Sequence, residues 1–168
     1  MPDGSTVPYG FGDLLALARQ SWVRELQAVL EGAGYADYRR SDALALRLLV
    51  PGPLAVGRLG GALGVTRQAA KKVATGLAAR GYAAILHDAH DGRQVNVVLT
   101  ERGQRYAQAI ADARRRLDAG LARRLAPGLL AAADTVLRTA LFDERARSLA
   151  ARIPRPREGP GGADATVT

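Results

Sequence analysis

The chain has 168 residues, of which 48% are hydrophobic; this is enough to build a packed core and excludes a chain that is disordered throughout. Aromatic residues make up only 5% while alanine and leucine abound, so the composition favours helices over a β-sandwich or a barrel. The net charge is +8, and no cysteine is present, which excludes disulfides, zinc–thiolate sites, iron–sulfur clusters and cysteine-based redox sensors.

The positive charge has two possible origins. Arginine supplies 22 of the 24 lysine and arginine residues, in a chain that is also rich in alanine and glycine, so genomic base composition can account for much of it. The charge alone is therefore only weak support for nucleic acid as a partner. The lysines are more informative, because the only two in the chain are adjacent, Lys71 and Lys72.

No targeting or membrane segment is recognisable in the sequence. The start of the chain lacks the basic and apolar regions of a signal peptide, and no uncharged apolar stretch reaches the roughly 18 residues that cross a membrane. We therefore expect a cytoplasmic protein, associated with the bacterial nucleoid if it binds DNA.

Helices dominate the first third of the chain. After a flexible lead over residues 1–8, apolar side chains over residues 9–30 recur at the i, i+3, i+4, i+7 spacing of a long amphipathic helix. A second helix is expected over residues 41–50, with Ser41 as its N-cap and Asp42 in its first turn. A Pro-Gly-Pro sequence then ends this helix.

The middle of the chain has the expected order strand, helix, helix, strand, strand. A short strand and a short helix lead to a turn at Gly64, where an unusual φ is needed, and Thr66 then caps a longer helix. Two strands follow, joined by a turn that contains an Asp-Gly pair, which is typical of a β-hairpin. The expected bounds of these elements are 54–56, 57–63, 66–80, 83–88 and 94–99.

The last part of the chain returns to helices. One is expected over residues 100–125, where an Ala-Pro-Gly sequence ends it, and another over residues 129–152. From residue 154 the chain is rich in proline and glycine and is expected to be disordered. The sequence thus predicts a mainly α protein with a small β-wing.

The helix over residues 66–80 carries the main functional signal. One face holds alanine, valine and leucine, while another face is polar and cationic and has no carboxylate. A solvated helix usually mixes the two signs of charge, whereas a helix that enters a groove lined by phosphates does not. Glutamine suits adenine edges, lysine and arginine suit guanine edges, and a capping threonine with the helix N-terminus can hold a phosphate. The residues of this face are Thr66, Arg67, Gln68, Lys71, Lys72 and Thr75.

The surroundings of this helix match a known arrangement. A short helix, a glycine-containing turn and a second helix form a helix-turn-helix, whose second helix lies in the major groove, and a hairpin with an arginine near its tip can reach the minor groove. The run PGPLAVGRLGGALGVTRQAAKKVATGLAARGY, followed by DGRQVNVVLTERG, resembles the winged helix-turn-helix of MarR-family transcription factors. The features that carry the resemblance are the Gly-Pro before the strand, the turn entering TRQA, the closing ARGY, the D-x-R wing tip and the final LTERG.

The resemblance implies roles for individual residues. The six residues of the cationic face form the recognition helix, Arg93 is the wing arginine, and Asp91 supports it. Members of the family are homodimers, built through their first and last helices, that bind pseudo-palindromic operators in double-stranded DNA and usually repress. Many release DNA when a small phenolic or aromatic carboxylate ligand binds. The wing departs from the family pattern at Ile85, Leu86 and Gly92, which predicts weaker clamping of the DNA backbone.

The terminal helices also favour a dimer on physical grounds. A winged domain of about 60 residues cannot cover the apolar faces of both helices, and the alternative is that they fold back on their own domain. For an effector, Trp22 is the one large rigid aromatic side chain, and Arg19, Tyr38 and Arg39 are placed to hold a carboxylate or phenol beside it. The competing role of Trp22 is core or dimer packing.

An enzyme is the first alternative class. The serines lie outside any recognisable nucleophile motif, and no glycine-rich phosphate loop follows a strand, so we expect no catalytic residue and no cofactor. His87, Asp88, His90 and Asp91 lie close together near the hairpin turn, but such residues in a loop are more often solvated than metal-bound, and no metal is expected. A second alternative is a winged-helix adaptor that binds protein or RNA without operator specificity.

We therefore predict a winged helix-turn-helix domain flanked by N- and C-terminal dimerisation helices. Its expected function is sequence-specific DNA binding as a homodimeric transcriptional regulator, a repressor that a small effector releases. Its parts are a flexible N-terminus (1–8), N-terminal helices (9–53), the DNA-binding region (54–103), C-terminal dimerisation helices (104–153) and a disordered tail (154–168).

Overall fold

The computed structural model of the chain describes residues 10–87 and 95–151. The chain forms two units, residues 1–115 and 116–168. The predicted flexible lead and disordered tail lie outside the described residues, as does the hairpin turn at 88–94. Among the helices that the structure describes, none is long and apolar enough to cross a membrane.

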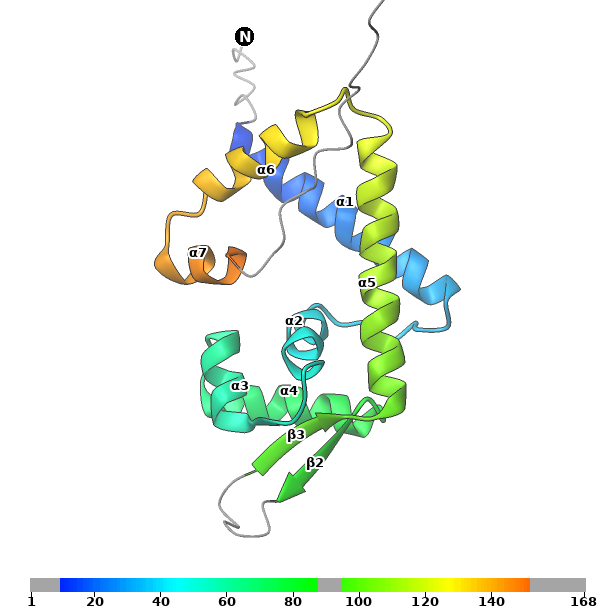
Figure 1. The fold of residues 1–168 in the computed structure, drawn as a ribbon, viewed down its shortest axis with the longest axis vertical. Helices are drawn as coiled ribbons and strands as arrows, with labels where there is room; N and C mark the ends of the chain where they lie inside the picture. Colours follow the sequence, from blue (N-terminus) through cyan, green and yellow to red (C-terminus); the bar gives the residue numbers. More distant parts are fainter. Residues whose placement is uncertain (1–9, 88–94, 152–168) are drawn as a thin grey trace, which may run out of the picture. The chain divides into compact units, whose positions relative to one another are not determined.

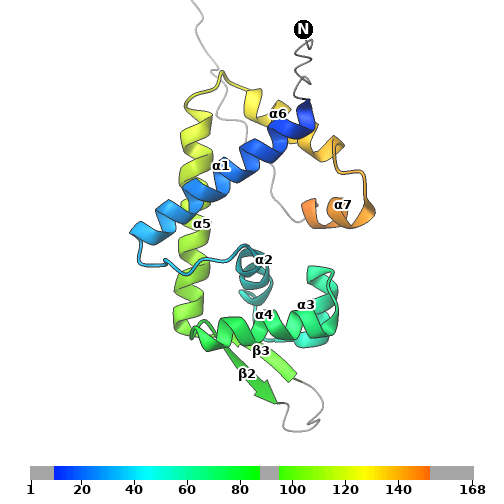
Figure 2. The ribbon, with the colours of Figure 1, turned by 180° about the vertical axis from the view of Figure 1, so that it is seen from behind.

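The first unit consists of two helices, a winged helix-turn-helix and the start of a third long helix (Figure 1). The view from behind in Figure 2 shows the fourth helix, α4, along its length, with the strands β2 and β3 beside it. Each predicted element of this unit up to the last strand is present, with bounds that differ by no more than two residues. The elements are α1 (Phe11–Gly32), α2 (Arg40–Leu49), β1 (Leu54–Ala55), α3 (Val56–Leu63), α4 (Arg67–Ala79), β2 (Ala83–His87), β3 (Val95–Leu99) and the first part of α5 (Glu101–Ala122).

The three strands form one antiparallel sheet in the order β1-β3-β2. β2 and β3 are paired along their whole length, from Ala83 opposite Leu99 to His87 opposite Val95. β1 contributes only two residues, on the other side of β3. Because α3 begins directly after β1, this short strand ties the start of the helix-turn-helix to the sheet.

The core of the first unit lies between α2, α3, α4 and the sheet. Each of these elements presents one apolar face at its own period, 3.6 residues for a helix and 2 for a strand. Almost fully buried side chains include Leu46 and Leu49 of α2, Leu59 of α3, Leu77 of α4 and Val97 of β3. Burial of one such side chain contributes about 1.5–3 kcal/mol, so these contacts hold α4 in place from behind.

The sheet is locked to α5 where β3 ends. The Thr100 hydroxyl donates to the Gly81 carbonyl oxygen (2.6 Å) and accepts from the Gly103 N–H (3.0 Å). Gly103 is buried against the backbone of Tyr82, and a Cβ atom at this position would collide with the Tyr82 carbonyl oxygen. The ARGY and LTERG sequences are therefore the two halves of one contact.

The start of α2 differs from the prediction in two ways. Arg39, not Ser41, is the N-cap residue, and its side chain makes no capping hydrogen bond. The Ser41 hydroxyl lies 3.4 Å from Oδ1 of Asp42, to which it donates. Asp42 is in the first turn as predicted, but it is buried, because Arg80 binds it.

The second unit holds the end of α5, then α6 (Leu129–Thr139) and α7 (Glu144–Ala150). The prediction of a single helix over residues 129–152 is wrong. The chain leaves the helix after Thr139, and the Asp143 carboxylate starts a new helix by accepting from the Ala146 N–H (2.7 Å). Neither α6 nor α7 contains a buried residue, so the apolar side chains of these two helices are not covered within the chain.

Candidate nucleic-acid interface

α4 presents the predicted polar face to solvent. Thr66 caps the helix, its hydroxyl oxygen accepting from the Ala69 N–H (3.2 Å). The opposite side, which carries Ala70, Ala74 and Leu77, is buried in the core. α4 contains no Asp or Glu, so the exposed face is positive. All the residues predicted to contact DNA from this helix and its cap are exposed: Thr66, Arg67, Gln68, Lys71, Lys72 and Thr75.

The turn between α3 and α4 is built on glycine. Gly64 follows α3 in the left-handed conformation (φ +64°), which residues with a side chain rarely adopt. The Val65 N–H then donates to the Gly60 carbonyl oxygen (2.9 Å), which closes the end of α3. The tight turn leaves the N-terminus of α4 exposed, and this is the end of a helix that attracts phosphate.

A buried ion pair anchors the other end of α4. Arg80, just after the helix, donates two hydrogen bonds to the Asp42 carboxylate (Nη1–Oδ2 2.7 Å, Nη2–Oδ1 2.9 Å). It also donates through Nε to the Gly76 carbonyl oxygen (2.9 Å) and through Nη1 to the Asp37 carbonyl oxygen (3.1 Å). The Asp42 side chain is only 2% exposed, and its hydrogen bonds raise the pKa of the Arg80 guanidinium. The pair therefore joins α2 to α4.

Three tyrosines stack beside this ion pair. The Tyr106 ring stacks on those of Tyr35 and Tyr82, at centroid distances of 4.9 and 4.3 Å. The Tyr82 hydroxyl donates to Oδ1 of Asp37 (2.7 Å), whereas the buried Tyr106 hydroxyl has no hydrogen-bond partner in the part of the chain that the structure describes. Burial raises the pKa of Tyr106 well above its usual value, so this hydroxyl stays neutral at physiological pH. The stack holds the segment between α1 and α2 against α5.

The predicted wing contacts, Asp91 and Arg93, lie outside the described residues, as do Asp88 and His90 of the metal site that the sequence raised as an alternative. Among the residues that are described, no group of three or more His, Asp or Glu side chains is placed to hold a metal. β2 and β3 contain no lysine or arginine, and Leu86 of β2 is 49% exposed. These two strands thus offer apolar rather than basic side chains.

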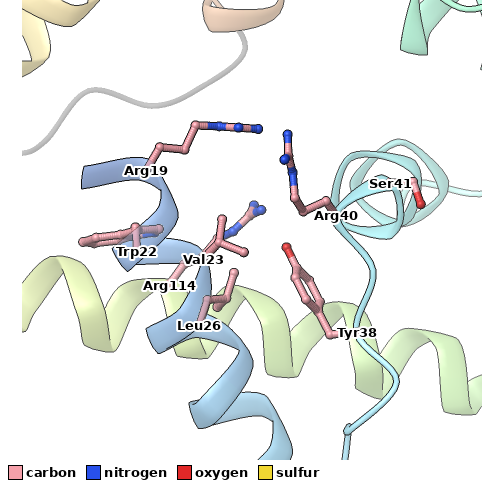
Figure 3. A pocket seen from close by; sticks show the side chains of 8 residues that line it. All are labelled: Arg19, Trp22, Val23, Leu26, Tyr38, Arg40, Ser41 and Arg114. Carbon is pink, nitrogen blue, oxygen red and sulfur yellow. The ribbon is translucent and has the colours of Figure 1, made fainter. Parts of the chain in front are cut away.

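A pocket of about 400 Å³ is lined by residues of α1, α2, the segment between them and α5 (Figure 3). Three of the four residues predicted to hold an effector line it, namely Arg19, Trp22 and Tyr38. The structure adds Arg40 and Arg114, which sequence reasoning did not assign to an effector site. The remaining lining residues are Val23, Leu26 and Ser41.

This pocket is strongly positive. Figure 3 shows Arg19 and Arg40 extended toward each other, with the Tyr38 hydroxyl pointing toward Arg40 and Arg114 reaching up from α5. None of the three guanidinium groups has an ion pair or hydrogen bond to another described residue, and no Asp or Glu is among the described residues of the lining. Because three like charges around one space repel one another, the pocket favours an anion.

Arg39 does not join this group and lines a second cavity, of about 170 Å³, beside α4. The backbone at Arg39 is extended (φ −124°, ψ 139°), and in such a chain successive side chains point to opposite sides. Tyr38 and Arg40 therefore line one cavity while Arg39 lines the other. The other residues of the second cavity are Ser41, Asp42, Lys72, Val73, Gly76 and Arg80.

Comparisons with known proteins match the chain through its structure. No family model and no curated protein matches the sequence. One similar solved structure is BpsR of Bordetella bronchiseptica, described with the regulation of its DNA binding by 6-hydroxynicotinic acid (23% identity, TM-score 0.63, covering 82% of this chain and 99% of BpsR). Another is the PcaV transcriptional regulator of Streptomyces coelicolor in complex with its natural ligand (21% identity, TM-score 0.61, covering 83% and 94%). A third is a mutant of Escherichia coli MarR complexed with operator DNA (21% identity, TM-score 0.63, covering 77% and 92%).

These similarities extend over most of this chain and over nearly all of each neighbour, and at such low identity they establish the fold. The chain has the winged-helix fold of MarR-type transcriptional regulators, mostly helical with a small three-stranded antiparallel sheet. The predicted fold class is confirmed.

Proposed function

We propose that this chain, which folds like MarR-type regulators, is itself a MarR-family transcriptional regulator that reads specific DNA sequences with α4. The observation that carries the proposal is the exposed face of α4, which is polar and cationic, contains no carboxylate and is presented by a helix-turn-helix. In this motif the second helix lies in the major groove, where such a face meets base edges and phosphates. The similarity to MarR complexed with operator DNA supports the same docking.

The side chains of the interface divide by their chemistry. Gln68 can pair with both polar atoms of an adenine edge, and Lys71 and Lys72 suit guanine edges or phosphates. The capping threonine and the exposed N-terminus of α4 suit a phosphate. Arg93, supported by Asp91, adds a contact in the neighbouring minor groove.

We infer that the regulator is a homodimer. α1 exposes apolar side chains that include Leu14 (61% exposed) and Leu17, and α6 exposes Leu129 and Val136. Exposed apolar faces of this kind are typical of protein interfaces. A two-fold dimer sets its recognition helices about 34 Å apart, which is one turn of DNA, and therefore requires a pseudo-palindromic operator.

We assign regulation to the positive pocket. A small aromatic or phenolic acid would place its acidic group on the arginines and its ring against Val23, Leu26 and Trp22. The DNA binding of BpsR is regulated by 6-hydroxynicotinic acid, which is an acid of this kind. By analogy, the ligand releases this chain from its operator, and the chain acts as a repressor.

The direct test of the function is DNA binding at several salt concentrations, with duplex fragments selected from the source genome. We expect the double variant Lys71→Ala, Lys72→Ala to bind more weakly. The slope of log affinity against log salt should flatten by about 1 for each phosphate that a subunit no longer binds. An unchanged affinity and slope would rule out α4 as the reading helix.

The matched control is the double variant Arg123→Ala, Arg124→Ala. It removes the same charge from two adjacent exposed positions of the second unit, so its slope should stay close to that of the parent protein. Equal binding of selected and scrambled duplexes by the parent would instead support a winged-helix adaptor without operator specificity.

A further inference from the structure

The smaller cavity, beside α4, has no role in the function proposed so far. It is lined from α4 by Lys72, Val73 and Gly76, and from the start of α2 by Arg39, Ser41 and Asp42, with Arg80 closing it. Its volume of about 170 Å³ exceeds that of several water molecules, at about 30 Å³ each. The cavity lies directly at the edge of the cationic face, because Lys72 belongs to both.

Arg39 brings a second charge to this edge from a different element. A Cβ atom built on Gly76 would lie 3.9 Å from Nη1 of Arg39, so the guanidinium rests on the surface of α4. Gly76 is four residues after Lys72, and positions four apart are neighbours on a helix. Arg39 thus extends the cationic face of α4 by about one turn.

The charges of Arg39 and Lys72 are not compensated locally. The one carboxylate of the described lining is Asp42, which is 2% exposed and accepts two hydrogen bonds from Arg80. Neither Arg39 nor Lys72 has an ion pair with another residue that the structure describes. An arginine and a lysine that share an open cavity favour an anion with several oxygens.

We infer that Arg39 is a DNA-binding residue, which holds a backbone phosphate together with Lys72 at the edge of the major groove. The inference rests on the proposed function, since it needs α4 in the groove. It assigns adjacent arginines to different partners: Arg39 to the DNA and Arg40 to the anion in the larger pocket. A phosphate contact of this kind positions α4 without reading sequence.

The test compares Arg39→Gln with Arg40→Gln, which remove the same charge from neighbouring residues. DNA binding is measured as a function of salt, and anion binding is measured without DNA by calorimetry with 6-hydroxynicotinate as the probe. We expect Arg39→Gln to flatten the salt slope by about 2 in a dimer, one phosphate per subunit, and to leave the calorimetric affinity unchanged. Arg40→Gln should do the reverse, with an unchanged salt slope and weaker binding of the probe.

Two further measurements make the result decisive. Arg39→Lys keeps the charge, so it should restore most of the salt slope, and matching thermal melts of all variants exclude a loss of folding. If Arg39→Gln keeps the parent slope while Lys71→Ala, Lys72→Ala flattens it, the inference about Arg39 fails and the proposed function stands. If both keep the parent slope, the proposed function itself fails.

Discussion

Asp42 is the one charged side chain in the core that the described residues form, and its charge is balanced by Arg80. A buried pair of this kind adds little beyond what apolar packing would give. The loss of one partner is costly, because it leaves an unpaired charge away from water. The pair also explains why α4 keeps its position, since it ties the end of that helix to α2.

Arg80→Ala should therefore destabilise the protein strongly. We expect the free energy of unfolding to fall by about 3–5 kcal/mol, because the Asp42 carboxylate stays buried without its partner. The control is Arg105→Ala, which removes an exposed arginine that lies 3.5 Å from Glu101 and should cost less than about 1 kcal/mol. Urea denaturation measures both, and equal losses would contradict the role given to Asp42.

The residues of the larger pocket show how far the sequence could predict a site. Arg19 and Trp22 are one turn apart on an amphipathic helix, so their proximity followed from the helical period. Arg114 lies far along the chain, and only the packing of α5 brings it to the same space. The Arg80–Asp42 pair escaped the sequence for the same reason, since 38 residues separate its members.

At the scale of elements, the contact between Tyr82 and Gly103 fixes where the wing meets α5. The Gly103 backbone lies so close to the Tyr82 carbonyl oxygen that no side chain fits between them. Thr100 bonds to both sides of this junction and holds the two backbones at that distance. The wing strands are therefore anchored at their base, next to the C-terminal end of α4.

Gly103→Ala should push the wing away from α5. We expect the free energy of unfolding to fall by at least about 2 kcal/mol, because the new methyl group forces the packed backbone to shift. Gly61→Ala is the control: Gly61 lies inside α3 with open space around its Cβ position, so alanine should stabilise by about 0.5–1 kcal/mol through its helix propensity. Thermal melts that move in the same direction for both variants would argue against the close contact.

The elements themselves were predictable where one apolar period governs a stretch. α1, α4 and the hairpin pair were expected within two residues of their observed bounds, because the helix caps and the turn residues agree with the hydrophobic pattern. The break between α6 and α7 was not expected. Leu141 and Phe142 continue an apolar run, and the Asp143 cap that starts α7 outweighs it. Capping by one residue is a weaker signal in a sequence than periodicity.

At the scale of the whole molecule, the exposed apolar faces of α1 and α6 are the features that the proposed dimer explains. Leu14→Glu places a charge on the apolar face of α1 and should convert the dimer to a monomer. We expect a halved mass in size-exclusion chromatography with light scattering, and much weaker operator binding, because one recognition helix cannot span two half-sites.

Gln20→Glu is the control for this experiment, since it adds the same charge at an exposed polar position of α1. It should leave the mass unchanged. A parent protein that is already monomeric at micromolar concentration would overturn the proposed dimer.

One stretch of backbone serves both cavities of the first unit. Tyr38 and Arg40 line the anion pocket, Arg39 between them lies against α4, and Asp42 just beyond holds Arg80. A displacement that suits an anion is therefore also a displacement of groups that support the DNA contact. Thermodynamic linkage makes such an effect mutual: by whatever factor the anion lowers the affinity for the operator, the operator lowers the affinity for the anion. A regulator seated on its operator is then a duller sensor than one that is free, and it responds only to the higher concentrations of ligand.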